Sequence, residues 1–195
     1  MGGAKSARTE ATKQKLERVA RELFAEHGFA GVSAEQVVAR ADVTRGALYH
    51  HYSGKAGLFE AVVEANMREV HDKLVAKVAG ALDPLDALTL GIVAFLDVCA
   101  EPVTHRLLLI EAPAVLGWNR WREMDAKYGF GLLKGALAAA MRTGQLRRQD
   151  VDVLGHVLLG ALTELAMMIS RSSSPHETRS AAQQAIISMI DGWRR

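Results

Sequence analysis

Cysteine is almost missing from this chain, and long uninterrupted apolar runs are missing too. The single cysteine, Cys99, excludes an intrachain disulfide and a zinc site built from several thiolates, and we expect it to be a small buried hydrophobic residue. The longest apolar stretch, residues 151–169, is interrupted by His156, Thr163 and Glu164, so we expect no membrane span. The opening MGGAKSARTE has no apolar segment of a signal peptide, which predicts a cytoplasmic protein.

An overall excess of one charge is also missing. The net charge is +2 over 195 residues, which excludes a polycation of the histone kind. The distribution is uneven, because residues 1–55 hold nine Lys or Arg and six Asp or Glu, a difference of +3, and this leaves −1 for the remainder. The amino-terminal part is therefore the part that we expect to approach a polyanion such as DNA.

Catalytic and metal-binding motifs are absent from the sequence as well. It contains no Glu-x-x-His pair of a di-iron bundle, no His-Glu-x-x-His and no Gly-x-Ser-x-Gly. The segment GFGLLKG at Gly129 only approaches a dinucleotide-binding loop, since a preceding strand and a correctly spaced third glycine are lacking. We expect no enzyme activity, no cofactor and no metal.

Helical periodicity runs through the whole chain, and no segment alternates as a strand would. Glycine and proline divide the pattern into about nine helices. The first predicted helix ends at Gly28, and the next two lie as a pair within 33–55. The fourth covers about 54–79, and the fifth and sixth begin at Pro84 and at Pro102. The last three cover 120–143, 150–171 and the segment from Pro175 to the carboxyl end. The sequence therefore predicts an all-α fold.

The second and third of these helices lie in residues 33–55, SAEQVVARADVTRGALYHHYSGK, with a tight turn between them. Ser33 and Gln36 fit a capping box, and Thr44 fits the N-cap of the next helix. That next helix is expected to direct a guanidinium, a phenol and two imidazoles outward with no acid among them, from Arg45, Gly46, Tyr49, His50 and His51. Such a surface suits the major groove of DNA, so we predict a helix-turn-helix.

Three signatures follow one another between about residues 12 and 59: FAEHGF, then VSAEQVVARADVTRGALYHHY, then KAGLF. In this order and spacing they resemble the tetracycline-repressor (TetR) family of bacterial transcription regulators. The resemblance implies a three-helix DNA-binding head at residues 1–55 and a helical effector-binding and dimerisation domain at residues 56–195. It also implies a nucleoid-associated homodimer on palindromic double-stranded DNA, usually acting as a repressor.

Side-chain chemistry and the resemblance together predict the DNA contacts. Arg45 can pair bidentately with guanine O6 and N7, and Gly46 would let the helix approach the groove closely. The resemblance adds His50 as a base contact, and it implies backbone contacts by Ser33, Thr44, Tyr49, His51 and Lys55. A cation such as Lys55 in the first turn of a helix is unfavourable unless a phosphate docks there. Lys5 and Arg8 would extend the contacts as a basic arm, whereas Tyr52 is expected in the core.

The last two predicted helices are too apolar to remain in water, and the resemblance implies that they form the dimer interface. The candidate interface residues are Leu158, Ala161, Leu162, Leu165, Ile186, Met189, Ile190 and Trp193. Burial within one chain is the alternative explanation for part of this apolar surface.

Aromatic residues are few but gather at residues 118–130, which predicts the wall of a pocket for a small hydrophobic effector. The candidate lining residues are Met67, His71, Phe95, Trp118, Trp121, Met124, Tyr128, Glu164 and Met167. A buried Glu164 would need a cationic partner, either internal or on the ligand. Two alternatives stay open: the aromatic residues are ordinary core, and the regulator has no small-molecule ligand and is constitutive or gated by a protein partner.

Overall fold

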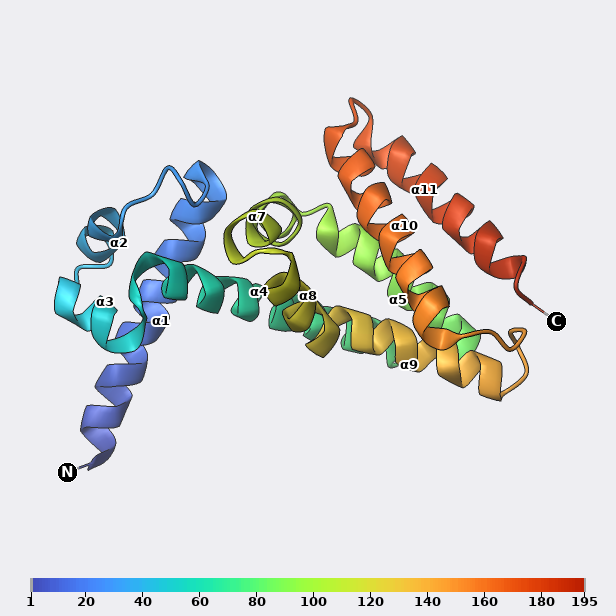
Figure 1. The fold of residues 1–195 in the computed structure, drawn as a ribbon, viewed down its shortest axis with the longest axis horizontal. Coiled ribbons are helices and arrows are strands. Elements are labelled where there is room, and N and C mark those ends of the chain that lie inside the picture. The colour runs from blue at the N-terminus through green and yellow to red at the C-terminus, as the bar shows by residue number, and fades with distance from the viewer. Residues whose placement is uncertain (1, 195) are drawn as a thin grey trace.

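The computed structural model describes residues 2–194, with side chains from residue 6 onward, and these residues are helical almost throughout (Figure 1). Their β-type pairing is limited to one isolated antiparallel bridge between Leu146 and Arg194. The elements are α1 (Gly2–His27), α2 (Ala34–Arg40), α3 (Arg45–His51), α4 (Gly54–Val78), α5 (Pro84–Cys99), α6 (Pro102–Thr104), the π-helix η1 (His105–Glu111), α7 (Ala112–Leu116), α8 (Trp118–Lys127), α9 (Gly129–Arg142), α10 (Val151–Arg171) and α11 (Pro175–Asp191). The predicted all-α class is confirmed.

The helix-turn-helix begins with the predicted caps. The Ser33 hydroxyl accepts the Gln36 amide hydrogen at 3.1 Å, and the Gln36 side chain accepts the Ser33 amide hydrogen at 2.7 Å. The Thr44 hydroxyl accepts the Ala47 amide hydrogen at 3.2 Å and starts α3. Between the helices the chain turns through Asp42 at φ +48°, a left-handed conformation that Asp tolerates better than most residues. These local bonds fix how α3 is presented.

Two predicted helices are interrupted. The helix that begins at Pro102 consists of α6, η1 and α7, and it ends at Gly117, where φ is +80°. The helix predicted over residues 120–143 is divided into α8 and α9 at Tyr128. There the His71 ring nitrogen Nδ1 donates to the Tyr128 carbonyl at 3.2 Å, and the Tyr128 hydroxyl donates to Glu64 at 2.8 Å. Hydrogen bonds to α4 therefore stabilise the helix break at Tyr128, which we did not predict from the sequence.

The hydrophobic interior forms two clusters joined through the body. One extends from α1, α2 and α3 along α4 to Trp121 and Tyr128, with Phe24 and Phe59 edge to face at 5.2 Å. The other lies among α5, α9, α10 and α11 and includes Cys99, which is buried as predicted. In Figure 1, α1–α3 lie at one end of the molecule, α10 and α11 lie side by side at the other, and α4 connects the two regions.

The α1 helix begins at Gly2, so the predicted basic arm is part of a helix rather than an extended tail. Arg8 is exposed on it, and the side chain of Lys5 lies outside the described residues.

The α10 helix has the length and the apolar composition that a membrane span requires, so the expectation that no segment qualifies was wrong. The α5 helix and the segment Pro102–Leu116 would qualify only as a pair bent by 83°. One side of α10 packs on α5, α9 and α11 and buries residues such as Leu158 and Ile169. The core helix of a soluble protein can meet the same criteria, and one side of α10 lies in the core.

Candidate DNA-binding surface and ligand cavity

The α3 helix presents the predicted polar face to solvent. Arg45, Gly46, Tyr49 and His50 are exposed, and His51 is half-buried. The Arg45 guanidinium lies 5.4 Å from the centre of the Tyr49 ring, and its Nη1 is 3.4 Å from Oε1 of Glu35 in α2. This Glu35 carboxylate is a neighbour that sequence reasoning missed. An exposed ion pair of this kind is weak, so Arg45 is held over α3 yet remains available to a partner.

Gly46 has no packing reason to be glycine within the described residues. A Cβ built at this position would approach only the Thr44 hydroxyl, at 3.9 Å, which is ordinary van der Waals contact. The missing side chain therefore leaves the outer surface of α3 flat. A flat surface beside Arg45 suits close approach to another molecule.

Lys55 has a different environment from the one predicted. Its ammonium donates to the carbonyl oxygens of Phe29 and Val32 at 3.0 and 2.8 Å, and it lies 4.0 Å from the centre of the Phe29 ring. These acceptors explain a cation in the first turn of α4 without a phosphate, and the predicted phosphate contact stays a prediction. An ammonium has three donors, and the two carbonyls leave one for another acceptor.

Tyr52, at the end of α3, belongs to the core as predicted. Its hydroxyl donates to Glu17 of α1 at 2.7 Å. Burial first, and then this hydrogen bond to Glu17, raise the pKa of Tyr52. The tyrosine therefore fixes α3 to α1 as a neutral phenol.

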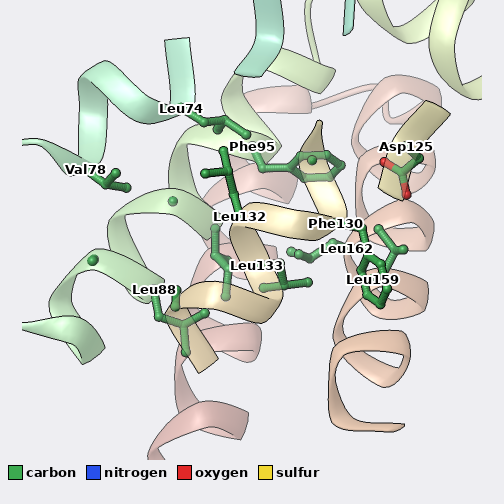
Figure 2. A pocket seen from close by; sticks show the side chains of 15 residues that line it. Leu74, Val78, Leu88, Phe95, Asp125, Phe130, Leu132, Leu133, Leu159 and Leu162 are labelled. Atoms are coloured by element: carbon green, nitrogen blue, oxygen red, sulfur yellow. The ribbon is translucent and has the colours of Figure 1, made fainter. Parts of the chain in front are cut away.

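The body contains an apolar cavity of about 100 Å³ bounded by α4, α5, α8, α9 and α10 (Figure 2). Its lining residues are Leu74, Val78, Ala87, Leu88, Gly91, Ile92, Phe95, Asp125, Gly129, Phe130, Leu132, Leu133, Ala136, Leu159 and Leu162. A second cavity of about 40 Å³ shares four of them, Phe95, Asp125, Gly129 and Leu159. The two cavities therefore meet around Asp125 and the start of α9.

Asp125 is the functional candidate that sequence reasoning missed. Its side chain is 17% exposed, and its Oδ2 lies 3.0 Å from Arg122 Nη1. Burial raises the pKa of Asp125 to about 6, against the smaller opposing effect of Arg122. The Arg122 guanidinium in turn lies 5.5–5.7 Å from the ring centres of Trp118, Trp121 and Phe130. The sequence feature that points to Asp125 is a carboxyl group within the aromatic stretch 118–130, four residues after Trp121.

The predicted pocket residues divide into two groups. Met67, Phe95, Trp121 and Tyr128 line the second cavity, and Phe95 lines both. The remaining five line neither: Met124 is buried in the first core cluster, His71 is bonded to Tyr128, Met167 is half-buried, Glu164 is exposed, and Trp118 is 63% exposed.

The prediction of a buried Glu164 was wrong because of the rotation of α10. This helix turns Leu159 and Leu162 toward the larger cavity and Glu164 to the outside. The prediction for Trp118 was wrong because its ring lies on the surface at the start of α8, 5.0 Å from that of Trp121.

The predicted interface residues divide in a similar way. Leu158, Leu162, Ile186 and Ile190 are buried inside one chain, so they are core and unavailable to a second copy. Ala161, Leu165, Met189 and Trp193 are half-buried. The outward side of α10 instead exposes Val153, Val157 and Met168. Of the predicted interface residues, half are therefore on the sides of α10 and α11 that pack within the chain.

Side chains of η1 hold the carboxyl end of α1, and we call this contact the α1–η1 clasp. Arg106 Nη1 donates to the carbonyls of Ala25 and Glu26 at 3.1 and 2.9 Å. Glu111 Oε2 accepts the Phe29 amide hydrogen at 3.1 Å. Gly28 takes φ +73° there, and a Cβ at this glycine would lie 2.5 Å from Glu111 Oε1. The clasp therefore joins the helix-turn-helix region to the body at a point away from α4.

A capped helix-turn-helix with an exposed recognition face, on a helical body with an apolar cavity, defines the class of DNA-binding transcription regulators. Comparison with family models agrees. Residues 18–62 match the model of bacterial regulatory proteins of the tetR family, and residues 85–193 match that of the tetracyclin repressor-like C-terminal domain. The chain belongs to the TetR family. Regulators of this family bind DNA, act as dimers, are generally repressors and are soluble cytoplasmic proteins.

Individual relatives support the assignment. The Transposon Tn10 TetC protein of Escherichia coli is 27% identical over 156 residues, which are 80% of this chain and 79% of that protein. A TetR-family transcriptional regulator from Pectobacterium atrosepticum has 29% identity and a TM-score of 0.79, over 96% of both chains. RolR, solved in complex with resorcinol, shares the fold at 18% identity and a TM-score of 0.72, over 95% of this chain and 90% of its own. The Pectobacterium atrosepticum relative is named as a transcriptional regulator.

Proposed function

We propose that this protein is a dimeric repressor that binds a palindromic operator through α3 and leaves it when a small hydrophobic effector enters the body. The observation that carries the proposal is the cavity and its walls. The π-helix η1 contributes Leu108 and Leu109 to the second cavity and Arg106 and Glu111 to the α1–η1 clasp. The binding of resorcinol by RolR supports an effector of small size, since the two proteins share a fold.

For DNA recognition, Arg45, Gly46 and His50 face the base edges, with Ser33, Thr44, Tyr49 and His51 along the backbone. The hydroxyls of Ser33 and Thr44 accept amide hydrogens as caps, so the hydrogen of each hydroxyl is free to donate to a phosphate oxygen. Lys55, in the first turn of α4, adds its remaining N–H donor for another phosphate oxygen. The head at residues 1–55 thus reads the operator, residues 56–195 hold effector and dimer surfaces, and the protein resides on the nucleoid.

For the dimer, the outward side of α10 meets the same side of a second copy. Val153, Val157, Gly160, Glu164 and Met168 recur at intervals of three and four residues, which places them on one helix face. The adjoining face of α11 carries the exposed small residues Ala181 and Ala185. Apart from Glu164, these side chains are apolar or small, which suits close helix packing across a two-fold axis.

For release, the effector must prefer the state in which the two heads do not fit the operator. A ligand that displaces Leu108 and Leu109 moves η1, and through the clasp η1 moves the end of α1. Because α1 carries the helix-turn-helix, this displacement changes the distance between the two copies of α3. Ligand binding and DNA binding then oppose each other by the same coupling free energy.

The DNA part is tested by measuring the affinity of Arg45→Ala for an operator selected from random duplexes and for a scrambled duplex. Loss of a bidentate contact to guanine should lower discrimination by roughly tenfold or more. The control is Arg142→Ala, which removes the same charge from the exposed surface of the body. Full discrimination by Arg45→Ala would refute the role of Arg45.

A further inference from the structure

Asp125 is the one acidic side chain among the described residues that line the two cavities. Figure 2 shows it as the labelled side chain with oxygen atoms, while the other labelled side chains are hydrocarbon. Leucine, valine and phenylalanine side chains hold a ligand without orienting it. The carboxyl group of Asp125 is therefore the feature of this site that can select one ligand chemistry over another.

The two hydroxyl groups that line the second cavity are already engaged within the protein. The Tyr128 hydroxyl donates to Glu64 at 2.8 Å, and the Thr163 hydroxyl donates to the Leu159 carbonyl at 2.8 Å. The Asp125 carboxylate uses Oδ2 for Arg122, but a carboxylate has about four acceptor positions. At the junction of the cavities, Asp125 is therefore the main side chain that can accept a hydrogen bond from a ligand.

The opening of α9 keeps the other oxygen of Asp125 accessible. A Cβ built at Gly129 would lie 3.2 Å from Asp125 Oδ1, which is tighter than nine in ten real Cβ contacts. Gly129 itself lines both cavities. Because this position carries no side chain, Oδ1 is not covered from the start of α9 and can meet a group inside the cavity.

The size and charge of the site limit the ligand further. A dry apolar cavity of about 150 Å³ accommodates benzene, so cavities of about 100 and 40 Å³ that share a wall fit roughly one ring. A partly buried carboxylate is unfavourable until it is well paired, and its raised pKa agrees with incomplete pairing by Arg122. A ligand that donates a hydrogen bond relieves this cost, whereas an anionic ligand increases it.

We propose that the effector is a one-ring apolar molecule with a single hydrogen-bond donor, a hydroxyl or a protonated amine, directed at Oδ1 of Asp125. This inference rests on the proposed function, because it names the ligand class of the same cavity. The ring extends from the larger cavity, against Phe95 and Leu133, toward Leu108 and Leu109 of η1 in the second cavity, and the donor lies at the junction beside Gly129. Asp125 thus determines specificity, while the hydrocarbon walls supply most of the affinity.

The test is calorimetric titration of the full-length protein with four molecules of similar size: benzyl alcohol, benzylamine, toluene and benzoate. We expect the alcohol or the amine to bind at least tenfold more tightly than toluene, and benzoate to bind most weakly. In Asp125→Leu, the alcohol and the amine should no longer bind more tightly than toluene, while the affinity for toluene is unchanged. Glu123→Gln, an exposed acid on the same helix outside the cavities, is the matched control and should bind as the wild type does.

The two donor types are separated by Asp125→Asn, which keeps the size and an oxygen acceptor but removes the charge. It should weaken benzylamine binding more than benzyl alcohol binding if the ionised carboxylate selects a cation. Equal binding of toluene and both donors by the wild type, or an undiminished donor advantage in Asp125→Leu, would overturn the inference and leave the proposed function intact. Failure of all four molecules to bind the wild type would overturn the inference together with the effector part of the proposed function.

Discussion

Among single side chains, Lys55 shows how a charge that looks exposed in sequence acquires a structural role. Its two carbonyl acceptors, from Phe29 and Val32, belong to the loop between α1 and α2. The ammonium thus holds this loop against the start of α4. A phosphate contact through its third donor would add to that role without replacing it.

Lys55→Ala is expected to lower the free energy of unfolding by about 1–3 kcal/mol, because two part-buried carbonyls lose a charged donor. It should also weaken binding to all DNA sequences alike, since the loop precedes the helix-turn-helix. Thermal unfolding and DNA titrations check both effects. Lys77→Ala, an exposed lysine near the end of the same helix, should change neither. Weakened DNA binding with unchanged unfolding would mean that Lys55 acts through phosphate alone.

Asp125 predicts a dependence of stability on pH. Its folded pKa of about 6 lies above the ordinary 3.8, so the folded protein keeps a proton that the unfolded chain has released. The cost of ionising Asp125 is therefore absent well below pH 4, grows between about pH 4 and 6, and is complete above pH 6. The shift bounds this cost at about 3 kcal/mol.

Asp125→Asn should consequently gain stability relative to the wild type, and the gain should be larger at pH 7.5 than at pH 4.5. Urea unfolding at the two pH values measures the difference, with Glu123→Gln as the control. An equal difference at both pH values would show that the carboxyl group titrates normally in the folded protein.

These residues also show where sequence reasoning succeeds. Ser33 and Thr44 were assigned correctly because a cap depends on the next three residues. Glu164 was chosen because it is an acid among apolar neighbours, whereas Asp125 lies in the charged segment REMDAK and was missed. Only the rotation of α8 and α10 against their neighbours places Asp125 at the cavities and Glu164 outside. The carbonyl acceptors of Lys55 were missed because they lie 23 and 26 residues earlier in the chain.

Among the helices, η1 is the one that links the second cavity to the head. Pro113 and Gly117 are residues that disturb a helix, but a π-helix depends on packing that the sequence does not express. In η1 the wider winding brings Leu108 and Leu109 to the second cavity while Arg106 and Glu111 reach α1. π-helical segments often occur at functional sites. One short helix thus contacts both the ligand cavity and the head.

Glu111→Ala is expected to loosen the α1–η1 clasp. It leaves the Phe29 amide without its acceptor and Arg106 without its carboxylate, at a cost of about 1–2 kcal/mol. Hydrogen exchange should accelerate at residues 25–33, while the amide of Val37 in α2 keeps its protection. Glu101→Ala, which removes an exposed acid paired with Lys73, is the comparison. Unchanged exchange at residues 25–33 would exclude the clasp as a connection between body and head.

For the assembled protein, we propose that the outward side of α10 decides how two recognition helices are held together. One head contacts too little DNA for selective binding, so the spacing of two heads must be fixed by the dimer. Val153 and Val157 are 63% and 51% exposed in the single chain, on the helix whose composition would suit a membrane span. The exposure of these valines and the apolar composition of α10 are both explained if one side of the helix lies in its own core and the other packs against a second copy. The periodic pattern alone could not distinguish the two sides, because both are apolar.

Val157→Arg should therefore dissociate the dimer without unfolding the chain. The side chain is half exposed in one subunit, so arginine fits there, but a two-fold axis would bring the charge of each copy into an apolar contact. Light scattering should give a mass near the 21.1 kDa of one chain, and operator affinity should fall because each half-site is bound separately. Val75→Arg, at a 41% exposed position on α4 away from this face, should remain a dimer. A Val157→Arg protein that keeps the mass of a dimer would place the interface on another surface, and the geometry proposed for operator release would no longer hold.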